Sequence, residues 1–542
     1  MRITKVHITN YRSIKHVEID MNGMMGLIGP NSAGKSNILK AINLVLGERY
    51  PTANSITRKD FFNEDYSNQI EIKIWFDDSF LSYDVRCNGI VYRVHQEEDR
   101  GLASELKAIE SGTQTERKYN IKNESREKIS VIYIPAQRDF EYHITGTSEW
   151  SFFGKVIKKL NSYFPDERRA ELQSKFDEVK GTLTTDHFSR FESSFIKYFR
   201  EHAIPNEHDV DINFQAFDPK SYYKTIEIVP KEYGEVKNID QLGEGMKNII
   251  LLSLFRAYAE TFPETTIFLF EEPELYLHPQ ARTDMFSVFK ILKDAGSQII
   301  YSTHSQEFID VEFYDSICVV RKQEERGTYS TYISQIQAEE FVEKWIKETG
   351  IKNANDASIR SFLKIVSNAE TNRCFFAKIV VLVEGLTETW TLPIYAEKYG
   401  LNLAKNNIEI VGVGGKNNLE KFILLLECLR YKYYVIFDGD KTENESADIN
   451  LKLTKRFFSI GEKFPQTKCG SECTVFEEDF ESELKKGIST DPTAYDQLVD
   501  DARTTYALRS KNNKEIIARH IAYNTEVPGF INDILSNVKE KL

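Results

Sequence analysis

Short runs of apolar residues alternate along the chain with segments in which apolar positions recur every three or four residues. The runs MMGLI (residues 24–28), TIFLF (266–270) and QIIYST (298–303) have the length and content of strands that are buried on both faces. The first run leads through a glycine-rich loop into KSNILKAINLVLG, which has helical periodicity. Strands, loops and helices of this kind predict an α/β domain with a parallel sheet.

A second series of strand-like runs begins at Ala377. The runs IVVLV (379–383), IEIVGV (408–413) and YYVIF (433–437) are separated by segments with helical periodicity. Strands joined by helical crossovers pair in parallel. A second α/β domain with its own sheet is therefore expected near the C-terminus.

The segments between these two series differ in pattern. Residues 51–130 contain QIEIKIWF and GIVYRVH, which indicate antiparallel strands, whereas the residues around 151–235 are charged and have helical periodicity. The expected organisation is a first α/β domain in two parts (1–150 and 236–330), a helical insertion for dimerisation (151–235), a helical linker (331–376) and the second α/β domain (377–542).

Composition and charge narrow the classes of protein. A chain of 542 residues is too long for one ordinary core, and no apolar run approaches the roughly 18 residues that a membrane span needs. The opening MRITKVHITNYRSI lacks the features of a secretory signal, so we expect a cytoplasmic protein without a membrane partner. The net charge of −13 argues against indiscriminate nucleic-acid binding, so DNA binding must be argued from local sites.

The loop GPNSAGKS at residues 29–36 has the spacing of a phosphate-binding loop. Gly29 and Gly34 allow backbone N–H groups to turn toward phosphates. Lys35 is expected to reach the β- and γ-phosphates of ATP and Ser36 to ligate Mg²⁺, with Asn31 as a further nucleotide contact.

Two further segments supply acids and a histidine to this site. Glu271 and Glu272 follow an apolar strand, and we assign Glu271 to Mg²⁺ and Glu272 to the attacking water. His304 ends the next strand, where it can bond a γ-phosphate, although histidines at strand ends are usually structural. Gly243 and Gly245 open a long apolar helix whose N-terminus can hold a phosphate across a dimer interface.

The order GPNSAGKS, QLGEGMK, FLFEEPE with LHP, and YSTHS resembles the ABC-type ATPase head of recombination and chromosome-maintenance proteins. This resemblance implies head-to-head dimers with ATP between the subunits, and Gln137 is the candidate for the glutamine-bearing loop. The chain departs from the family in having Leu242 and Gly243 where the family pattern has a serine before the glycine pair.

Acids also end the strands of the second domain. Glu384 and Glu388 lie in VLVEGLTE, where we expect one helical turn between them, and Asp438 and Asp440 lie in VIFDGD. Parallel strands bring such acids to one edge of the sheet, where they would repel one another unless cations neutralised them. Oxygen ligands without histidine or thiolate select Mg²⁺ or Mn²⁺.

The stretch EEDFESEL adds Asp479 and Glu481, enough for a second metal position roughly 4 Å from the first. Two such ions suit in-line cleavage of a phosphodiester. The stretch SKNNKEIIARHIA offers Lys514, with Lys511 as the alternative, as the cation that stabilises the charged transition state.

The motifs VEG, GVGGKNN and DGD, with a late acid and lysine, are similar to those of a Toprim domain. An ABC-type head followed by a Toprim domain resembles the OLD (overcoming lysogenization defect) family of endonucleases, which includes the nuclease subunit of the Gabija antiphage system. By position, this resemblance implies that Lys514 is the transition-state cation and that six acids bind the metal ions: Glu384, Glu388, Asp438, Asp440, Asp479 and Glu481.

The sequence therefore predicts an ATP-regulated, metal-dependent DNA endonuclease or nickase in bacterial antiphage defence. It is expected to form homodimers or larger oligomers through its heads, with a helicase or a reverse transcriptase (retron) encoded nearby as a potential partner. The alternative is an ATP-dependent sensor or scaffold that binds nucleic acid or a partner protein without cutting. Topoisomerase-like strand transfer is a third option, but none of the 27 tyrosines is singled out as its nucleophile.

Overall fold

The computed structural model describes most of the chain. The described residues are 1–47, 49–97, 101–126, 129, 131–136, 143–144, 151–163, 165–202, 226–232, 234–262, 266–275, 277–368, 370–441, 446–488, 492–508 and 513–542. They form two compact units. Unit 1 comprises Met1–Tyr133, Thr265–Glu274 and Gln298–Leu542, and unit 2 comprises Ile134–Glu264 and Leu275–Ser297. The five-part division predicted from the sequence is finer than this one and stays a prediction.

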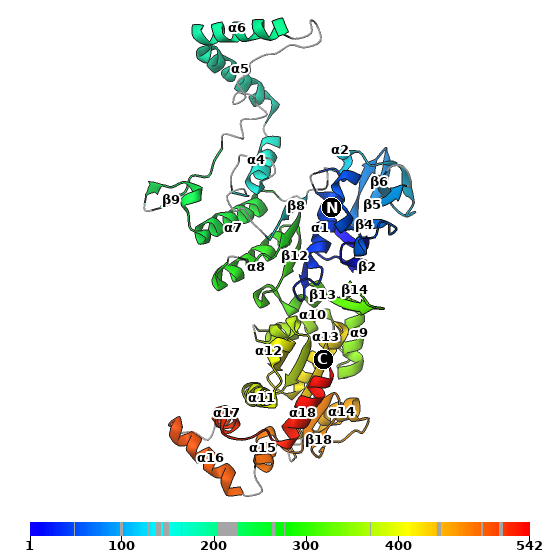
Figure 1. The fold of residues 1–542 in the computed structure, drawn as a ribbon, viewed down its shortest axis with the longest axis vertical. Helices are drawn as coiled ribbons and strands as arrows, with labels where there is room; N and C mark the ends of the chain where they lie inside the picture. Colours follow the sequence, from blue (N-terminus) through cyan, green and yellow to red (C-terminus); the bar gives the residue numbers. More distant parts are fainter. Residues whose placement is uncertain are drawn as a thin grey trace. The chain divides into compact units, whose positions relative to one another are not determined.

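The first sheet carries the phosphate loop and confirms the predicted α/β class (Figure 1). Its central strands pair in parallel, and its last two form an antiparallel hairpin at one edge. In spatial order the strands are β14 (Thr328–Gln335), β13 (Ile317–Glu325), β3 (Met24–Ile28), β12 (Gln298–Thr303), β11 (Ile267–Glu271) and β8 (Val131–Ile134). Helix α1 (Lys35–Leu46) follows β3 and packs against β11 and β12.

A second sheet of unit 1 is antiparallel, as QIEIKIWF and GIVYRVH predict. Alternate residues of its strands are buried, so one face closes over a core shared with α1. In spatial order the strands are β2 (Ile14–Asp20), β1 (Ile3–Tyr11), β4 (Ile70–Ser82), β5 (Val85–Glu97), β6 (Gly101–Glu110) and β7 (Glu116–Asn120), and the short helix α2 (Asn123–Arg126) follows.

The C-terminal part of unit 1 has the predicted sheet of its own. Its strands, in spatial order, are β16 (Ile408–Gly412), β15 (Ile379–Val383), β17 (Lys432–Asp438), β19 (Cys473–Phe476) and β18 (Lys468–Cys469), of which only β18 runs antiparallel to its neighbour. Its helices are α11 (Leu386–Tyr399), α12 (Leu403–Asn406), α13 (Lys416–Cys428), α14 (Ala447–Phe458), α15 (Phe480–Ile488), α16 (Pro492–Thr505), α17 (Lys514–Asn524) and α18 (Gly529–Glu540).

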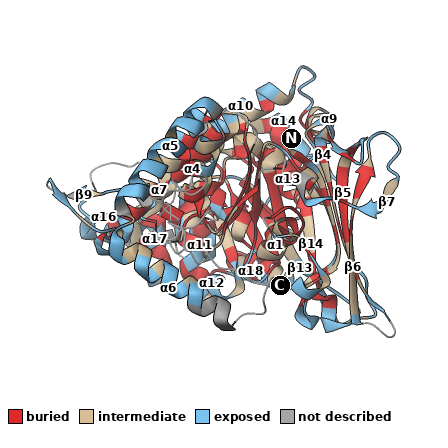
Figure 2. Cartoon of the chain, turned by 90° about the horizontal axis from the view of Figure 1, so that it is seen from above, coloured by how far each residue is buried: buried red, intermediate tan, exposed pale blue. Residues whose placement is uncertain are grey.

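Helices cover both faces of this sheet, which explains its continuous apolar runs. Val380 and Leu382 of β15 belong to one core with residues of α13, and Val381 and Val383 belong to another with residues of α11, α17 and α18. Figure 2 shows the buried residues concentrated along the strands, whereas α5 and α6 are largely exposed.

The core on the α13 side also contains residues of the first sheet. Ile28 of β3 and Val319 of β13 belong to it, as do Phe341 and Trp345 of α9 (Ala338–Thr349) and Leu363 of α10 (Asp356–Val366). The helices predicted as a linker are therefore packed into a core that joins the two sheets.

Unit 2 is largely helical. It contains α4 (Phe152–Ser162), α5 (Asp166–Leu183), α6 (Asp186–His202), α7 (Glu244–Thr261), α8 (Pro279–Asp294) and a small hairpin of β9 (Lys231–Glu232) and β10 (Glu235–Val236). Phe152 packs on Phe255, with ring centroids 4.5 Å apart. The helices predicted after Gly243 and in the insertion are present, and a role in dimerisation stays a prediction. Among the described helices, none has the length and apolar content needed to cross a membrane.

Candidate functional site

The loop between β3 and α1 is built around two glycines in conformations that other residues rarely adopt. Gly29 has a φ of 144° and Gly34 a φ of 115°. A Cβ on Gly29 would lie 2.0 Å from the carbonyl oxygen of Val320, and one on Gly34 would lie 2.2 Å from Oγ1 of Thr331. Both positions therefore require glycine, and the loop backbone stays free to meet a ligand at the start of α1.

Lys35 is the first residue of α1 and is almost fully buried. It donates hydrogen bonds to the carbonyl oxygens of Gly29 (2.8 Å) and Pro30 (3.0 Å) and to Nε2 of His304 (2.7 Å). Burial lowers the pKa of Lys35 to about 8, and burial together with the charge of Lys35 lowers the pKa of His304 to about 4. His304 is therefore a neutral acceptor beside the phosphate loop, and its bond to a γ-phosphate stays a prediction.

Glu271 and Glu272 are adjacent in sequence but have different surroundings. Glu271 is buried, accepts a hydrogen bond from the hydroxyl of Tyr133 (2.7 Å) and lies 3.7 Å from Nζ of Lys40. Glu272 is partly exposed, and its Oε1 lies 3.7 Å from Nε2 of His304. Its backbone is left-handed, with a φ of 46°, a strained conformation for glutamate that is concentrated at functional sites.

Glu274 also belongs to this site and was not predicted. Its Oε1 accepts hydrogen bonds from Oγ1 of Thr303 (2.9 Å) and from the backbone N–H of His304 (2.5 Å). Burial raises the pKa of Glu274. The side chain positions the strand end that carries His304, and the only sequence signal for it was a further acid in the loop after β11.

The remaining residues predicted to contact the nucleotide differ in exposure and in position. Asn31 is exposed in the loop, and Ser36 is partly buried in the first turn of α1. Gly243 is the N-cap of α7 and Gly245 lies in its first turn, both in open space, and their phosphate contact stays a prediction. Gln137 lies outside the described residues.

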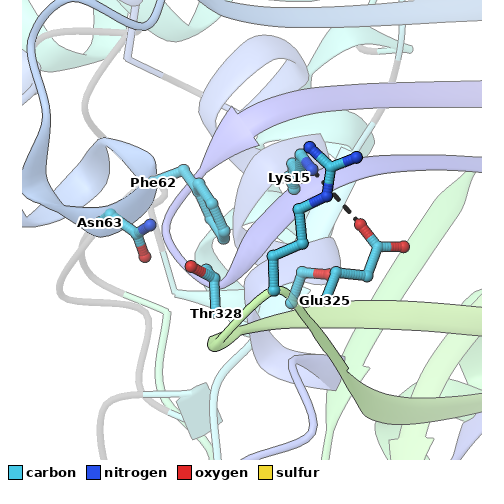
Figure 3. Close-up of a pocket in the computed structure, with 7 residues that line it drawn as sticks. Lys15, Phe62, Asn63, Glu325 and Thr328 are labelled. Atoms are coloured by element: carbon cyan, nitrogen blue, oxygen red, sulfur yellow. Dashed lines mark hydrogen bonds and ion pairs between the residues drawn. The ribbon is translucent and has the colours of Figure 1, made fainter.

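A pocket of about 760 Å³ is lined in part by the hairpin of β13 and β14. Ser330 lines it, and the next residue, Thr331, donates a hydrogen bond to the loop carbonyl of Ala33 (2.9 Å). Figure 3 shows Lys15 and Glu325 paired across the pocket, 3.3 Å apart. The other lining residues are Phe62, Asn63, Arg326 and Thr328.

Glu384 and Glu388 lie on different elements of the C-terminal domain. Glu384 directly follows β15, and its Oε1 accepts a hydrogen bond from the backbone N–H of Asp438 (2.8 Å). Glu388 lies in the first turn of α11 and is buried. The prediction of one helical turn between them is wrong, because Gly385 is extended and the helix begins only at Leu386.

Asp438 and Asp440 flank a glycine at the end of β17. A Cβ on Gly439 would lie 2.3 Å from the carbonyl oxygen of Phe476, so only glycine lets the chain pass β19 here. Oδ1 of Asp438 is buried and has no hydrogen-bond partner among the described residues. Asp440 has a left-handed backbone with a φ of 47°. The N–H of Asp440 donates a hydrogen bond to the carbonyl oxygen of Glu478 (3.0 Å), which fixes this turn beside the segment after β19.

Asp479, Glu481 and Lys514 complete the group. Oδ1 of Asp479 accepts a hydrogen bond from the N–H of Ser482 (2.8 Å), and its Oδ2 lies 3.5 Å from Nζ of Lys514. Glu481 accepts a hydrogen bond from the hydroxyl of Thr387 (3.0 Å). Lys514 is the first residue of α17, and the charges of Glu481 and Asp479 raise its pKa. Lys511, the alternative cation, lies outside the described residues.

Burial and neighbouring charges change the pKa values of these groups. Burial raises the pKa of Glu384 and of Glu388 to about 7. Burial, and then the charges of Glu388, Glu384, Glu481 and Asp479, raises the pKa of Asp438 well above its usual value. We call the six predicted acids the acid site, since the structure gathers them at one edge of the sheet.

Carboxylate oxygens suit a divalent cation, and the buried Oδ1 of Asp438, which has no partner in the described part of the chain, is an available ligand atom. Among the described side chains, no three acids, histidines or cysteines already stand close enough together to hold an ion. The residues therefore fit divalent metal ions, but the carboxylates must draw together to bind them.

Lys416 lies within the acid site and was not predicted. It is the first residue of α13 and is 6% exposed. Its ammonium pairs with Oδ2 of Asp440 and lies 3.8 Å from Oε1 of Glu384. The signal was available in GVGGKNN, where the lysine follows a strand end and two glycines.

A cavity of about 530 Å³ lies next to the acid site between α15, α16 and α17. Asp479, Glu481 and Lys514 line it on one side, and Tyr495 and Arg503 line it on the other. A polar ligand that entered this cavity would meet acids and a lysine together. That combination suits a phosphate group bridged by metal ions.

Comparison with known families agrees with this arrangement. The AAA ATPase domain model matches residues 1–128 and 95–309, which together make up more than half of the chain. The model of the overcoming lysogenization defect protein-like TOPRIM domain matches residues 375–440, which include four of the six acids and Lys416. The first match covers the phosphate loop, and the second covers part of the acid site.

Three relatives share most of their length with this chain. The OLD nuclease of Thermus scotoductus is 24% identical over 81% of this chain and 82% of its own. The Old nuclease of Escherichia phage P2 is 25% identical over 82% and 78%. The endonuclease GajA of Bacillus cereus is 21% identical over 81% and 75%. The chain therefore belongs to the AAA ATPase domain family, and its C-terminal OLD-like TOPRIM domain makes it a homologue of the OLD nucleases.

Proposed function

We propose that this protein is an ATP-hydrolysing, metal-dependent DNA endonuclease or nickase. The observation that carries the proposal is the convergence of four other acids and Lys514 around Asp438, whose Oδ1 is buried without a partner among the described residues. A structural role would leave such acids paired or exposed, because an unpaired buried charge is strongly unfavourable. Perturbed carboxylates that gather beside a cavity are typical of a catalytic metal site.

Each group has a role in phosphodiester cleavage. Glu384, Glu388, Asp438 and Asp440 would hold one or two Mg²⁺ or Mn²⁺ ions, with Asp479 and Glu481 at the second position. The ions supply an activated water and stabilise the departing oxygen when they are bound. Lys514 is mostly exposed beside Asp479, where its ammonium can meet a non-bridging phosphate oxygen.

The ATPase site would bind ATP with Mg²⁺. Lys35 would exchange its loop carbonyls for the β- and γ-phosphates, and Ser36 and Glu271 would hold the Mg²⁺. Glu272 would orient the attacking water, because its carboxylate is partly exposed beside His304.

Nucleotide state would regulate cleavage, because one core joins the strand that carries the phosphate loop to the strands that carry the acid site. The protein would act as a homodimer or larger oligomer through its heads, with the N-terminus of α7 facing a nucleotide of another subunit. The names of the relatives support nuclease activity. We further propose a cytoplasmic protein that acts on DNA in antiphage defence, with a helicase or reverse transcriptase as a potential partner.

The test is conversion of supercoiled plasmid to nicked or linear DNA by the purified protein. Mg²⁺ and Mn²⁺ are titrated with and without ATP, and Glu384→Ala is measured in parallel. Cleavage that needs metal and is lost in the variant supports the proposal. Absence of cleavage under every condition, with a DNA or protein partner bound stably, would instead support an ATP-dependent sensor.

A further inference from the structure

Lys416 carries a charge opposite to that of the acid site and lies among the acids, whereas Lys514 lies beside them. Its side chain is 6% exposed, compared with 61% for Lys514. The ammonium contacts Asp440, which follows β17, and lies 3.8 Å from Glu384, which follows β15. It therefore bridges acids from the ends of two neighbouring strands.

The backbone is shaped to bring Lys416 to this place. Gly414 and Gly415 precede it with φ values of 72° and 120°, which glycine adopts readily. The N–H of Gly415 donates a hydrogen bond to the carbonyl oxygen of Glu384 (2.9 Å). The turn after β16 is thus tied to the residue whose carboxylate Lys416 approaches.

Lys416 occupies an unfavourable position for a lysine. The N-terminus of a helix carries a partial positive charge, so a buried lysine at the first position of α13 is unfavourable unless acids offset it. The side chain of the N-cap residue does not cap α13 either, because that residue is Gly415. The acids therefore stabilise the charge of Lys416, and Lys416 stabilises the charges of the acids. A surface ion pair would not need this mutual stabilisation, because water would solvate both partners.

We propose that Lys416 is an internal cation that holds the place of a divalent metal ion between Asp440 and Glu384. This inference rests on the proposed metal-dependent function. In the metal-free protein, Lys416 neutralises acids that would otherwise repel one another. When a metal ion binds, it takes over the two carboxylates and the ammonium gives them up. Lys416 thus competes with the metal and keeps the empty site folded.

Lys416 is therefore expected to lower the affinity of the site for metal and to raise the stability of the metal-free protein. Removing the ammonium frees the carboxylates of Asp440 and Glu384 for the metal. It also leaves these carboxylates uncompensated when no metal is present. A residue that only held the acids in position would behave differently, because its loss would weaken metal binding and stability together.

The experiment is calorimetric titration of Mn²⁺ into the full-length wild-type protein, Lys416→Met and Lys416→Arg, with thermal unfolding in EDTA and in saturating Mn²⁺. We expect Lys416→Met to bind Mn²⁺ about tenfold more tightly, since a competing unit charge within about 4 Å is lost. The melting temperature of Lys416→Met in EDTA should fall below that of the wild type. Saturating Mn²⁺ should reduce this difference in melting temperature. Lys416→Arg should stay close to the wild type.

The matched control is Lys452→Met. Lys452 of α14 pairs with Glu420 of α13, which lies one turn after Lys416, at 3.6 Å. This variant therefore breaks a lysine–glutamate pair at the same helix without touching the acid site. It should leave Mn²⁺ affinity unchanged. Should Lys416→Met not purify in a folded form, Lys416→Gln replaces it, since its amide can still donate to Asp440 without charge.

The inference would be overturned if the wild type bound Mn²⁺ and Lys416→Met, or Lys416→Gln in its place, bound it no more tightly. The proposed function would then still stand. Absence of Mn²⁺ binding by the wild type would overturn the metal-dependent function itself, and the inference with it. Metal binding and thermal unfolding distinguish these two outcomes without a cleavage assay.

Discussion

Arg321 of β13 donates a hydrogen bond from Nη1 to the carbonyl oxygen of Leu429 (3.0 Å), and its guanidinium lies over the ring of Tyr431, 3.9 Å from the centroid. Leu429 is the C-cap of α13, whose other end begins with Lys416 in the acid site. Strand β13 also pairs in parallel with β3, and Val319 lies opposite Ile28, the last residue of β3 before the phosphate loop. One helix therefore connects the edge of the ATPase sheet to the nuclease site.

Arg321→Met should weaken the effect of ATP on DNA cleavage while leaving the basal metal-dependent cleavage and ATP hydrolysis in place. The methionine cannot donate to the carbonyl oxygens of Leu429 and Arg430, so the end of α13 is no longer fixed to β13. The free energy of unfolding should also fall by about 1–3 kcal/mol, since the partly buried carbonyl oxygen of Leu429 loses its donor. The ratio of cleavage rates with and without ATP is the measurement.

The control for this variant is Lys322→Met, at the next and exposed position of β13. It should keep the wild-type response to ATP. A full ATP response in Arg321→Met would show that the two sites communicate by another route.

Asp438→Asn should abolish Mn²⁺-dependent cleavage and make the metal-free protein more stable. Burial and neighbouring acids raise the pKa of Asp438, so its ionised form destabilises the fold at neutral pH. The asparagine has almost the same shape without the charge, and we expect a gain of about 1–3 kcal/mol in the free energy of unfolding. Denaturant unfolding in EDTA at about pH 7.5, above the usual range of carboxyl groups, measures it. A loss of stability would contradict the unfavourable environment assigned to this carboxylate.

Glu272→Gln should bind ATP with near wild-type affinity but hydrolyse it at least about 100-fold more slowly, as expected when a general base is lost. Glutamine preserves the size of the side chain. Single-turnover hydrolysis and nucleotide titration separate the two effects. Glu339→Gln, in the first turn of α9, is the control. Persistent hydrolysis would move the role of base to another residue.

The acid site should make metal-free stability depend on pH. Glu384 and Glu388 have a pKa of about 7 in the folded protein and near 4.5 when unfolded. Between these values the unfolded chain binds fewer protons than the folded one, so their contribution to stability is complete below about pH 4.5 and is lost as the pH rises through 7.

The measurement is the pH dependence of the melting temperature in EDTA, compared with the double variant Glu384→Gln and Glu388→Gln. The wild type should lose stability relative to the variant between about pH 5 and 7. Saturating Mn²⁺ should remove this loss of stability from the wild type, because the metal holds both carboxylates ionised. Parallel pH profiles of the two proteins in EDTA would argue against the raised pKa values.

The positions of the strands and of the phosphate loop followed from the sequence, because each depends on local chemistry. Continuous apolar runs identified β3, β11 and β15 as strands buried on both faces. The acids that follow a strand were also predictable, since residues at the ends of parallel strands share one edge of the sheet. Glu384 and Asp438 are 54 residues apart in sequence and yet joined by a hydrogen bond.

Only the tertiary structure decided which groups complete each site and which conformations the chain must adopt. Lys416 faces acids of two other segments, Glu274 holds the backbone of His304, and Arg321 reaches the far end of α13. These contacts arise where crossovers return the chain to the same edge of a sheet, and no local pattern encodes which side chains then meet. The sequence by itself determined which acidic and basic residues stand at the strand ends. Packing in three dimensions decided which of these residues meet and which are charged, because burial and distance set the pKa of each group.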